Sequence, residues 1–284
     1  MAKRISRRIE LFGMHLHNGP TGGYEEIFER LRIIRRNRRV VRVGALVLAF
    51  PIVRKIGNLY FIQITEGDPD SAGLVLDATT GETRENVLAE NEVLSEATHL
   101  LVDPANRRAT IEYVRRGAKA IIIASALEGV LQRSDGLRSI RFEFSPIMTS
   151  EFEEEIDRFS RIREARIRIV KPNASWSDHY TELSALIESS NGEKAELDIK
   201  AGRGESLSKT NGIVKVLRDV VSDAQPYLEE ASLTGIREGE TAETTIRSSH
   251  HVVHTRESIP VDGAGVPSQD TILQRLRSLL AAWT

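Results

Sequence analysis

The chain contains no cysteine, which excludes a disulfide framework, a thiolate zinc site and a cysteine nucleophile. Aromatic residues make up only 5% of the 284 residues, so stacking platforms for nucleic-acid bases are scarce. The longest apolar run, 43–53, has eleven residues, well short of the ~20 that a membrane-spanning helix needs. The basic start 1–8 leads into a mixed segment with Glu10, which differs from a secretory apolar core. These absences predict a cytoplasmic protein without a membrane partner.

Arginine is abundant, at 31 of the 39 basic residues, and eleven of these arginines lie in the first 54 positions. They are densest in the stretch 30–42, and guanidinium groups bind phosphate and carboxylate bidentately. The net charge of -2 hides an asymmetry. Residues 1–60 carry thirteen Lys and Arg against four Glu, whereas residues 61–103 carry ten Asp and Glu against one Arg. The asymmetry either steers a polyanion to one face or lets the two segments pair inside the fold.

Hydrophobic periodicity predicts strands and helices in an irregular order. The expected strands are 5–16, 40–50, 58–65, 74–77, 98–102, 110–114, 140–144, 166–171, 195–200, 228–236 and 243–254. The expected helices are 24–37, 118–132, 152–159, 176–187, 213–221 and 268–283. Short turns join several neighbouring strands, which predicts an α+β fold with mixed or antiparallel sheets and helices packed on one face. The predicted parts are subdomains 1–148 and 149–258, followed by a connector and C-terminal helix over 259–284.

Some arginines are explained by helix stability and others are not. In helix 24–37, acidic residues fill the first turns and Arg32, Arg35 and Arg36 fill the last, which complements the helix dipole. If the polar faces of strands 140–144 and 166–171 adjoin, they form a basic surface for a phosphate backbone. The alternative is an ordinary charged face in which Glu143 and Glu164 pair with the arginines. The predicted nucleic-acid contacts are Arg38, Arg39, Arg42, Arg141, Arg166, Arg168 and Lys171.

A second candidate anion site is the loop Gly202, Arg203 and Gly204 between an expected strand and an expected helix. Glycines let backbone N–H groups approach an anion, and a helix N-terminus adds partial positive charge. The loop lacks the Lys-Ser/Thr of a P-loop and the third glycine of a dinucleotide fingerprint. The alternative is a tight turn capped by Ser206.

The sequence supports a metal site less well than it supports an anion-binding site. His250 and His254 would lie about 13 Å apart along the expected strand, too far to bind one ion. We expect neither a metal nor a cofactor, and we assign no catalytic residue. The alternative is a metal-dependent nuclease in which Glu196, Asp198 and Lys200 share one strand face, although no upstream acidic partner is identified.

The order of strand, Pro-Asn turn, helix, strand and Gly-Glu-Ser-Leu loop over 166–173, 183–187 and 201–207 resembles a bacterial family known as domain-of-unknown-function family 4747. The hairpin with Tyr60-Phe-Ile is similar in placement. The resemblance implies a soluble bacterial protein. Because such families are common in mobile defence islands, it also raises the expectation of an antiphage role. It supplies no catalytic residues.

The sequence therefore predicts a cytoplasmic protein that binds DNA or RNA through arginine and does not itself catalyse a reaction. One alternative is the nuclease. The other is a subunit that acts through protein contacts, with the C-terminal helix 272–283 docking on a second copy or on another protein.

Overall fold

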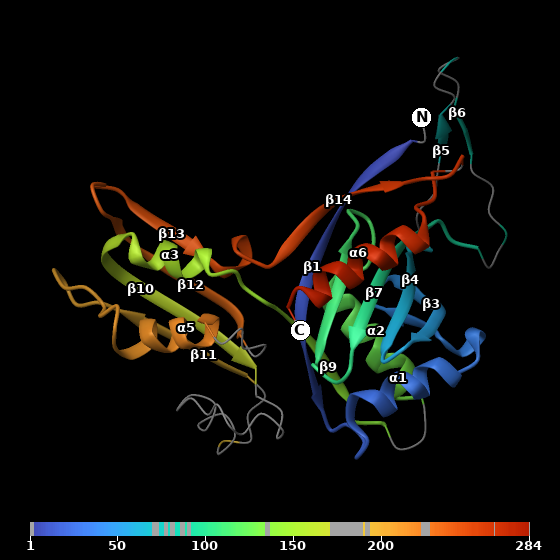
Figure 1. Cartoon of the computed structure of the whole chain (residues 1–284), viewed down its shortest axis with the longest axis horizontal. Coiled ribbons are helices and arrows are strands. Elements are labelled where there is room, and N and C mark those ends of the chain that lie inside the picture. Colours follow the sequence, from blue (N-terminus) through green and yellow to red (C-terminus); the bar gives the residue numbers. More distant parts are fainter. Residues whose placement is uncertain are drawn as a thin grey trace. The chain divides into compact units, whose positions relative to one another are not determined.

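The computed structural model describes residues 3–69, 92–133, 137–170, 194–222, 228–263 and 265–283, with short pieces between 74 and 89 and residue 190. The chain divides into two compact units. The first comprises Met1–Ile9, Asn18–Phe142 and Arg256–Thr284, and the second comprises Glu10–His17 and Glu143–Thr255. Both units combine helices with antiparallel strands, which confirms the α+β class (Figure 1).

The larger sheet has the strand order β14-β1-β8-β7-β4-β3-β2, and β9 also pairs with β1. The strands from β2 to β8 pair in antiparallel fashion along this order. A separate pair is formed by β5 and β6. The strand bounds are β1 Arg4–His17, β2 Val40–Val43, β3 Leu46–Ile56, β4 Leu59–Gly67, β5 Leu74–Leu76, β6 Thr83–Glu85, β7 Ser95–Asp103, β8 Arg108–Tyr113, β9 Arg141–Pro146 and β14 His254–Pro260.

Helices lie on both faces of this sheet (Figure 1). On one face, Phe28 of α1 packs on Tyr60 of β4, with ring centroids 5.6 Å apart. On the other, the Thr110 hydroxyl donates to the Leu276 carbonyl of α6 at 3.1 Å. Tyr60 and Thr110 pair with consecutive residues of β7, so their side chains point to opposite faces. The helices of this unit are α1 Gly23–Ile33, α2 Ala120–Leu131 and α6 Gln269–Ala281.

The prediction of one continuous strand over 40–50 is wrong. Strand β2 ends at Val43 and β3 begins at Leu46, because Gly44 turns the chain with a φ of 60°. The two strands pair with each other, and β2 is the last strand of the sheet. Val41 is buried, whereas Val40 and Arg42 are exposed. The segment is therefore a hairpin with one buried and one solvent-exposed face.

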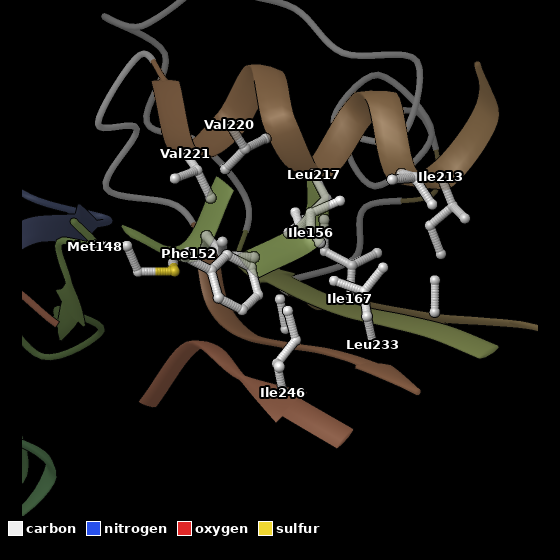
Figure 2. Packing of buried hydrophobic residues seen from close by; sticks show 14 of the residues in the cluster. Met148, Phe152, Ile156, Ile167, Ile213, Leu217, Val220, Val221, Leu233 and Ile246 are labelled. Atoms are coloured by element: carbon white, nitrogen blue, oxygen red, sulfur yellow. The ribbon is translucent and has the colours of Figure 1, made fainter. Parts of the chain in front are cut away.

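The second unit contains a four-stranded antiparallel sheet in the order β11-β10-β12-β13. Helices α3 and α5 supply the apolar side chains that cover one face of it. Figure 2 shows Leu217 and Val220 of α5 close to Phe152 of α3 and Ile167 of β10, all at most 1% exposed. The bounds are α3 Glu151–Asp157, β10 Phe159–Val170, β11 Lys194–Lys200, α5 Gly212–Ser222, β12 Leu228–Arg237 and β13 Glu243–Arg247.

Several details of the second unit differ from the predictions. The Ser-x-x-Glu pattern at 150–153 predicts a capping box at the start of α3, but the side chain of Ser150 accepts no cap hydrogen bond, so that prediction is wrong. The strand expected over 243–254 is also wrong, because β13 ends at Arg247 and the 3-10 turn Ser248–His250 follows. The helix expected over 176–187 lies outside the described residues. Among the helices that the structure describes, none has the length and apolar character to cross a bilayer.

Candidate polyanion-binding site

The polar face of the four-stranded sheet carries two of the predicted contact residues. Arg166 and Arg168 alternate with buried Ile167, so they share the face away from the helices. The register places Asp198 opposite Arg166 and Glu196 opposite Arg168. The guanidinium of Arg166 donates to Asp198 Oδ2 at 2.9 Å, and that of Arg168 donates to Glu196 Oε2 at 2.8 Å.

Further charges complete a ladder across this face. Glu164 lies 3.6 Å from Arg166, and Glu230 lies 3.5 Å from Arg168. The hydrogen bond that Arg166 donates to Asp198, together with the negative charge of Asp198, raises the pKa of Arg166 above its ordinary value. The structure thus pairs Arg166 with Glu164, as the alternative interpretation expected. A phosphate binding here would have to displace carboxylates that already occupy the guanidinium groups.

The same ladder bears on the nuclease alternative. Glu196, Asp198 and Lys200 lie on one face of β11, as predicted, but each has an ion-pair partner on β10. A guanidinium therefore occupies the space beside each carboxylate where a magnesium ion would bind. Within the described part of the chain, no group of three or more His, Asp and Glu side chains is arranged to hold a metal ion. The geometry favours an ion-pair ladder over a metal site.

The glycine loop does not open a helix. Helix α5 begins at Gly212, well beyond Gly202, Arg203 and Gly204, so its N-terminus does not face the loop. The side chain of Glu205 folds over Gly202, where an added Cβ would meet its carboxylate at 3.0 Å. Ser206 accepts a hydrogen bond from Ile162 N–H at 3.0 Å, so the expected cap is also absent. The loop is a turn bound to β10 by hydrogen bonds, and the carboxylate of Glu205 lies beside Gly202 where an anion would have to bind.

Arginine 39 has a structural role that its position in the sequence does not reveal. Its guanidinium donates to three carbonyls, those of Ile34 at 2.7 Å, Arg32 at 2.6 Å and Phe50 at 3.4 Å. The carbonyls of Arg32 and Ile34 lie at the end of α1, where helix carbonyls lack intrahelical partners. Arg39 therefore caps α1 and ties it to β3.

Helix α1 ends at Ile33, so the prediction of a helix to residue 37 is wrong. Ile34 and Arg35 are extended, with ψ of 133° and 142°. A 3-10 turn then spans Arg36–Arg38, closed by hydrogen bonds from Arg38 N–H to Arg35 O at 2.8 Å and from Arg39 N–H to Arg36 O at 3.1 Å. Arg35 and Arg36 thus lie beyond the helix, and its dipole does not account for them.

Four arginines project from this segment into solvent, and we call residues 35–42 the arginine turn. Arg35, Arg36, Arg38 and Arg42 are exposed, and none forms an ion pair or side-chain hydrogen bond with any residue that the structure describes. The acidic residues of α1 form ion pairs with other basic side chains. Glu26 binds Arg30 at 2.5 Å, Glu29 binds Arg32 at 2.8 Å, and Glu25 binds Lys55 at 2.5 Å.

Electrostatics at the turn are consistent with a local positive field. Burial lowers the pKa of Arg39, and the positive charge of Arg36 lowers it further. By contrast, hydrogen bonds from Tyr60 and Arg32 lower the pKa of Glu29 to about 2, which keeps that carboxylate ionised and bound to its own partners. The arginine turn is therefore a cationic segment to which the acidic residues of α1 supply no counter-ion.

The remaining predicted contacts do not join this surface as expected. Arg141 lies in β9 of the larger sheet, whereas Arg166 lies in the four-stranded sheet, so strands 140–144 and 166–171 do not form one basic face. Arg141 pairs weakly with Glu128 at 3.8 Å and is 59% exposed. Lys171 lies outside the described residues. Of the predicted contact residues, only Arg38 and Arg42 are among the four exposed arginines of the arginine turn that lack an ion pair within the described residues.

Sequence reasoning missed Arg35 and Arg36, although a signal was present. The helical apolar stripe ends at Ile34, and Asn37, a residue that favours turns, interrupts the arginine run three positions later. A helix ending before this run would have left both arginines without a dipole to complement.

Two other polar clusters lie in the first unit. A buried network joins Glu112, 1% exposed, to His99 Nδ1 at 2.6 Å and to Arg7 Nε at 3.0 Å. A cavity of about 350 Å³ is lined by several acidic side chains and one arginine, and burial raises the pKa of its Glu66. The first is a structural network within a sheet, and the second has the wrong charge to bind a polyanion.

Replacing Arg39 by methionine is expected to lower the free energy of unfolding by about 1–3 kcal/mol, because charged hydrogen bonds to three carbonyls are lost. Arg36→Met is the control, since that side chain has no hydrogen bond in the described structure, and we expect a change below about 0.5 kcal/mol. Denaturant unfolding monitored by circular dichroism measures both. Equal effects of the two substitutions would contradict the capping role.

Comparison with known proteins assigns the chain to a family. It belongs to the family described as Domain of unknown function (DUF4747), which matches residues 10–251 of the 284. This confirms the family resemblance seen in the sequence. The match includes both the arginine turn and the four-stranded sheet. No curated protein matches the chain.

Proposed function

We propose that this is a cytoplasmic nucleic-acid-binding protein whose arginine turn contacts the phosphate backbone without catalysing a reaction. The observation that carries the proposal is the set of four exposed arginines in one short segment, none of them paired with a carboxylate of the described chain. Guanidinium groups bind phosphate oxygens bidentately, and they do so best when no other anion occupies them. The proposed site is therefore confined to the arginine turn and no longer includes the arginines of β9 and β10.

Rigidity of the turn supports this function. The Arg39 guanidinium fixes the end of α1, and Phe50 N–H donates to the Arg39 carbonyl at 3.1 Å, so the backbone that carries the arginines is held at both sides. A surface that is ordered before binding loses less conformational entropy when its ligand arrives. The backbone of the turn is therefore ordered before binding, so that mainly the arginine side chains lose conformational freedom when a ligand binds.

The test is a salt titration of binding to labelled nucleic acid. Four phosphate contacts, each contributing about 0.7–0.9 to the slope, predict that log K falls with log salt with a slope of about −3. Fluorescence anisotropy at several salt concentrations measures this slope for RNA and DNA. Failure to bind either polymer at low salt, or binding that is independent of salt, would overturn the proposal.

The two alternative functions gain no support from the geometry. In the nuclease alternative, arginines occupy the carboxylates of Glu196 and Asp198. In the protein-subunit alternative, the stripe of α6 is already buried, with Ile272, Leu276 and Leu280 at most 2% exposed. The antiphage role is a proposal that rests on the family resemblance, and nucleic-acid binding is compatible with it.

A further inference from the structure

Strand β13 is an edge strand of the four-stranded sheet (Figure 1). Its inner edge pairs with β12 in an unbroken register, from Arg247 opposite Ser232 to Glu243 opposite Ile236. Its outer edge pairs with no other strand in the described part of the chain. An edge strand offers its backbone N–H and C=O groups to a further strand, unless proline, lysine or a bulge protects it. Residues 243–247 contain no proline or lysine, and their pairing with β12 has no bulge.

The side chains of β13 set the two faces that an added strand would have to match. Ile246 is 4% exposed and belongs to the apolar cluster shared with α3 and α5 (Figure 2). Glu243, Thr245 and Arg247 alternate with it and lie on the polar face, where Thr245 Oγ1 is 2.8 Å from Thr234 Oγ1 of β12. An added strand must therefore present polar groups on one face and aliphatic groups on the other.

The sequence of β13, Glu-Thr-Thr-Ile-Arg, meets this requirement when it pairs with a reversed copy of itself. A two-fold axis at Thr245 places Glu243 opposite Arg247 of the second copy, and Thr244 opposite its Ile246. Opposite residues of an antiparallel pair lie on the same face, so unlike charges meet on the polar face and β-branched side chains meet on the apolar face. A shift by two residues in either direction places one of the charges opposite Thr245 and removes the charge pairs.

Both charges are available for this pairing. Glu243 is 55% exposed, and its ion pair with Arg163 is long, at 3.9 Å. Arg247 is exposed and forms no ion pair with any residue that the structure describes. Unlike charges directly opposite each other stabilise a pair of strands, whereas like charges destabilise it. The edge is therefore self-complementary, as the interface of a two-fold dimer requires.

We infer that the chain forms a two-fold dimer in which β13 pairs with β13 of a second copy, joining the two four-stranded sheets into one sheet. The partner is a second copy because the charges and faces of β13 match the same strand reversed. This interface does not depend on the proposed nucleic-acid binding.

Light scattering coupled to size-exclusion chromatography tests the inference over a series of protein concentrations. We expect the native chain to reach twice the 31.7 kDa of one copy. Glu243→Arg and Arg247→Glu should each shift the protein to the mass of one copy, because like charges then face each other at both ends of the strand pair. The double variant Glu243→Arg/Arg247→Glu restores unlike charges and should restore the dimer. The matched control is Glu238→Arg, the same charge change at an exposed residue outside β13, which should keep the native mass.

A cross-link tests the position of the axis, since the chain has no cysteine of its own. In Thr245→Cys, the two thiols lie at the axis, where opposed Cα atoms are about 4.5–5.5 Å apart, a distance that a disulfide spans. Oxidation with oxidised glutathione should give a covalent dimer on a non-reducing gel. Thr241→Cys is the control, because its two copies would lie about 26 Å apart along the strands, and it should not cross-link.

A native protein with the mass of one copy at every concentration would overturn the inference, and the charges of β13 would then serve only to keep the edge solvated. A dimer that survives both single reversals would also overturn it. So would a double variant that is folded by circular dichroism but stays monomeric. Cross-linking of Thr241→Cys as readily as of Thr245→Cys would show that the copies meet through another surface.

Discussion

Replacing Glu112 by glutamine is expected to lower the free energy of unfolding by about 3–5 kcal/mol. Glu112 is 1% exposed and interacts with two cationic or polar partners, His99 at 2.6 Å and Arg7 at 3.0 Å. The substitution preserves the shape of the side chain but removes its charge, so the guanidinium of Arg7 loses its counter-ion in a poorly solvated site. The cost of leaving the Arg7 charge without its counter-ion adds to the loss of the hydrogen bond between Glu112 and His99.

Denaturant unfolding, monitored by circular dichroism, measures the change in the free energy of unfolding. Hydrogen exchange of the amides in β7 and β8 shows whether the loss of stability occurs in the strands that carry the network. The matched control is Glu26→Gln, which removes the charge from the exposed ion pair with Arg30 in α1 and should have a much smaller effect on the free energy of unfolding. A loss below about 1 kcal/mol for Glu112→Gln would show that the network does not hold the sheet together.

Much of the fold could be predicted because the elements are locally encoded. Strands β4, β7, β8 and β11 and helix α6 follow the predicted periodicity to within a few residues. The predictions failed where one residue changes the chain direction. Gly44 splits an apolar run into a hairpin, and the extended backbone at Ile34 and Arg35 ends a helix whose charge pattern suggested a further turn. A run of apolar residues does not reveal where the chain turns, because the same residues are compatible with one long strand and with two shorter paired strands.

The candidate site was harder to predict, because availability of an arginine depends on its spatial neighbours. Arg166 and Asp198 are 32 positions apart, and only the pairing of β10 with β11 brings them together. Arg39 is adjacent to Arg38 in sequence, yet one caps a helix and the other faces solvent. Residue type and local pattern therefore singled out arginine as the candidate side chain, whereas strand pairing and turn geometry determine which arginines have a carboxylate partner among the described residues.

The second large effect is expected from replacing Arg35, Arg36, Arg38 and Arg42 together by glutamine. Each substitution removes one of the proposed phosphate contacts and keeps a polar side chain at an exposed position, so the fold should be retained. We expect affinity for nucleic acid at low salt to fall at least about 100-fold, since each proposed contact would contribute to the release of counter-ions. Circular dichroism and the unfolding midpoint check that the variant is folded.

A control with the same charge change separates local contacts from the overall field. Glutamine at Arg158, Arg166, Arg168 and Lys215 removes four cations that are already paired with carboxylates in the second unit. Both variants make the formal net charge of -2 more negative by the same four charges. The net charge therefore changes equally, and the two variants differ in where the positive charge is lost.

The slope of log K against log salt in these two variants tests the central claim most directly. For the arginine-turn variant we predict a slope near zero, compared with about −3 for the native protein, because its phosphate contacts are gone. For the control we predict a slope close to that of the native protein. If the two variants instead showed equal slopes, or if the slope of the control fell further toward zero than that of the arginine-turn variant, the arginine turn would not be the nucleic-acid-binding surface.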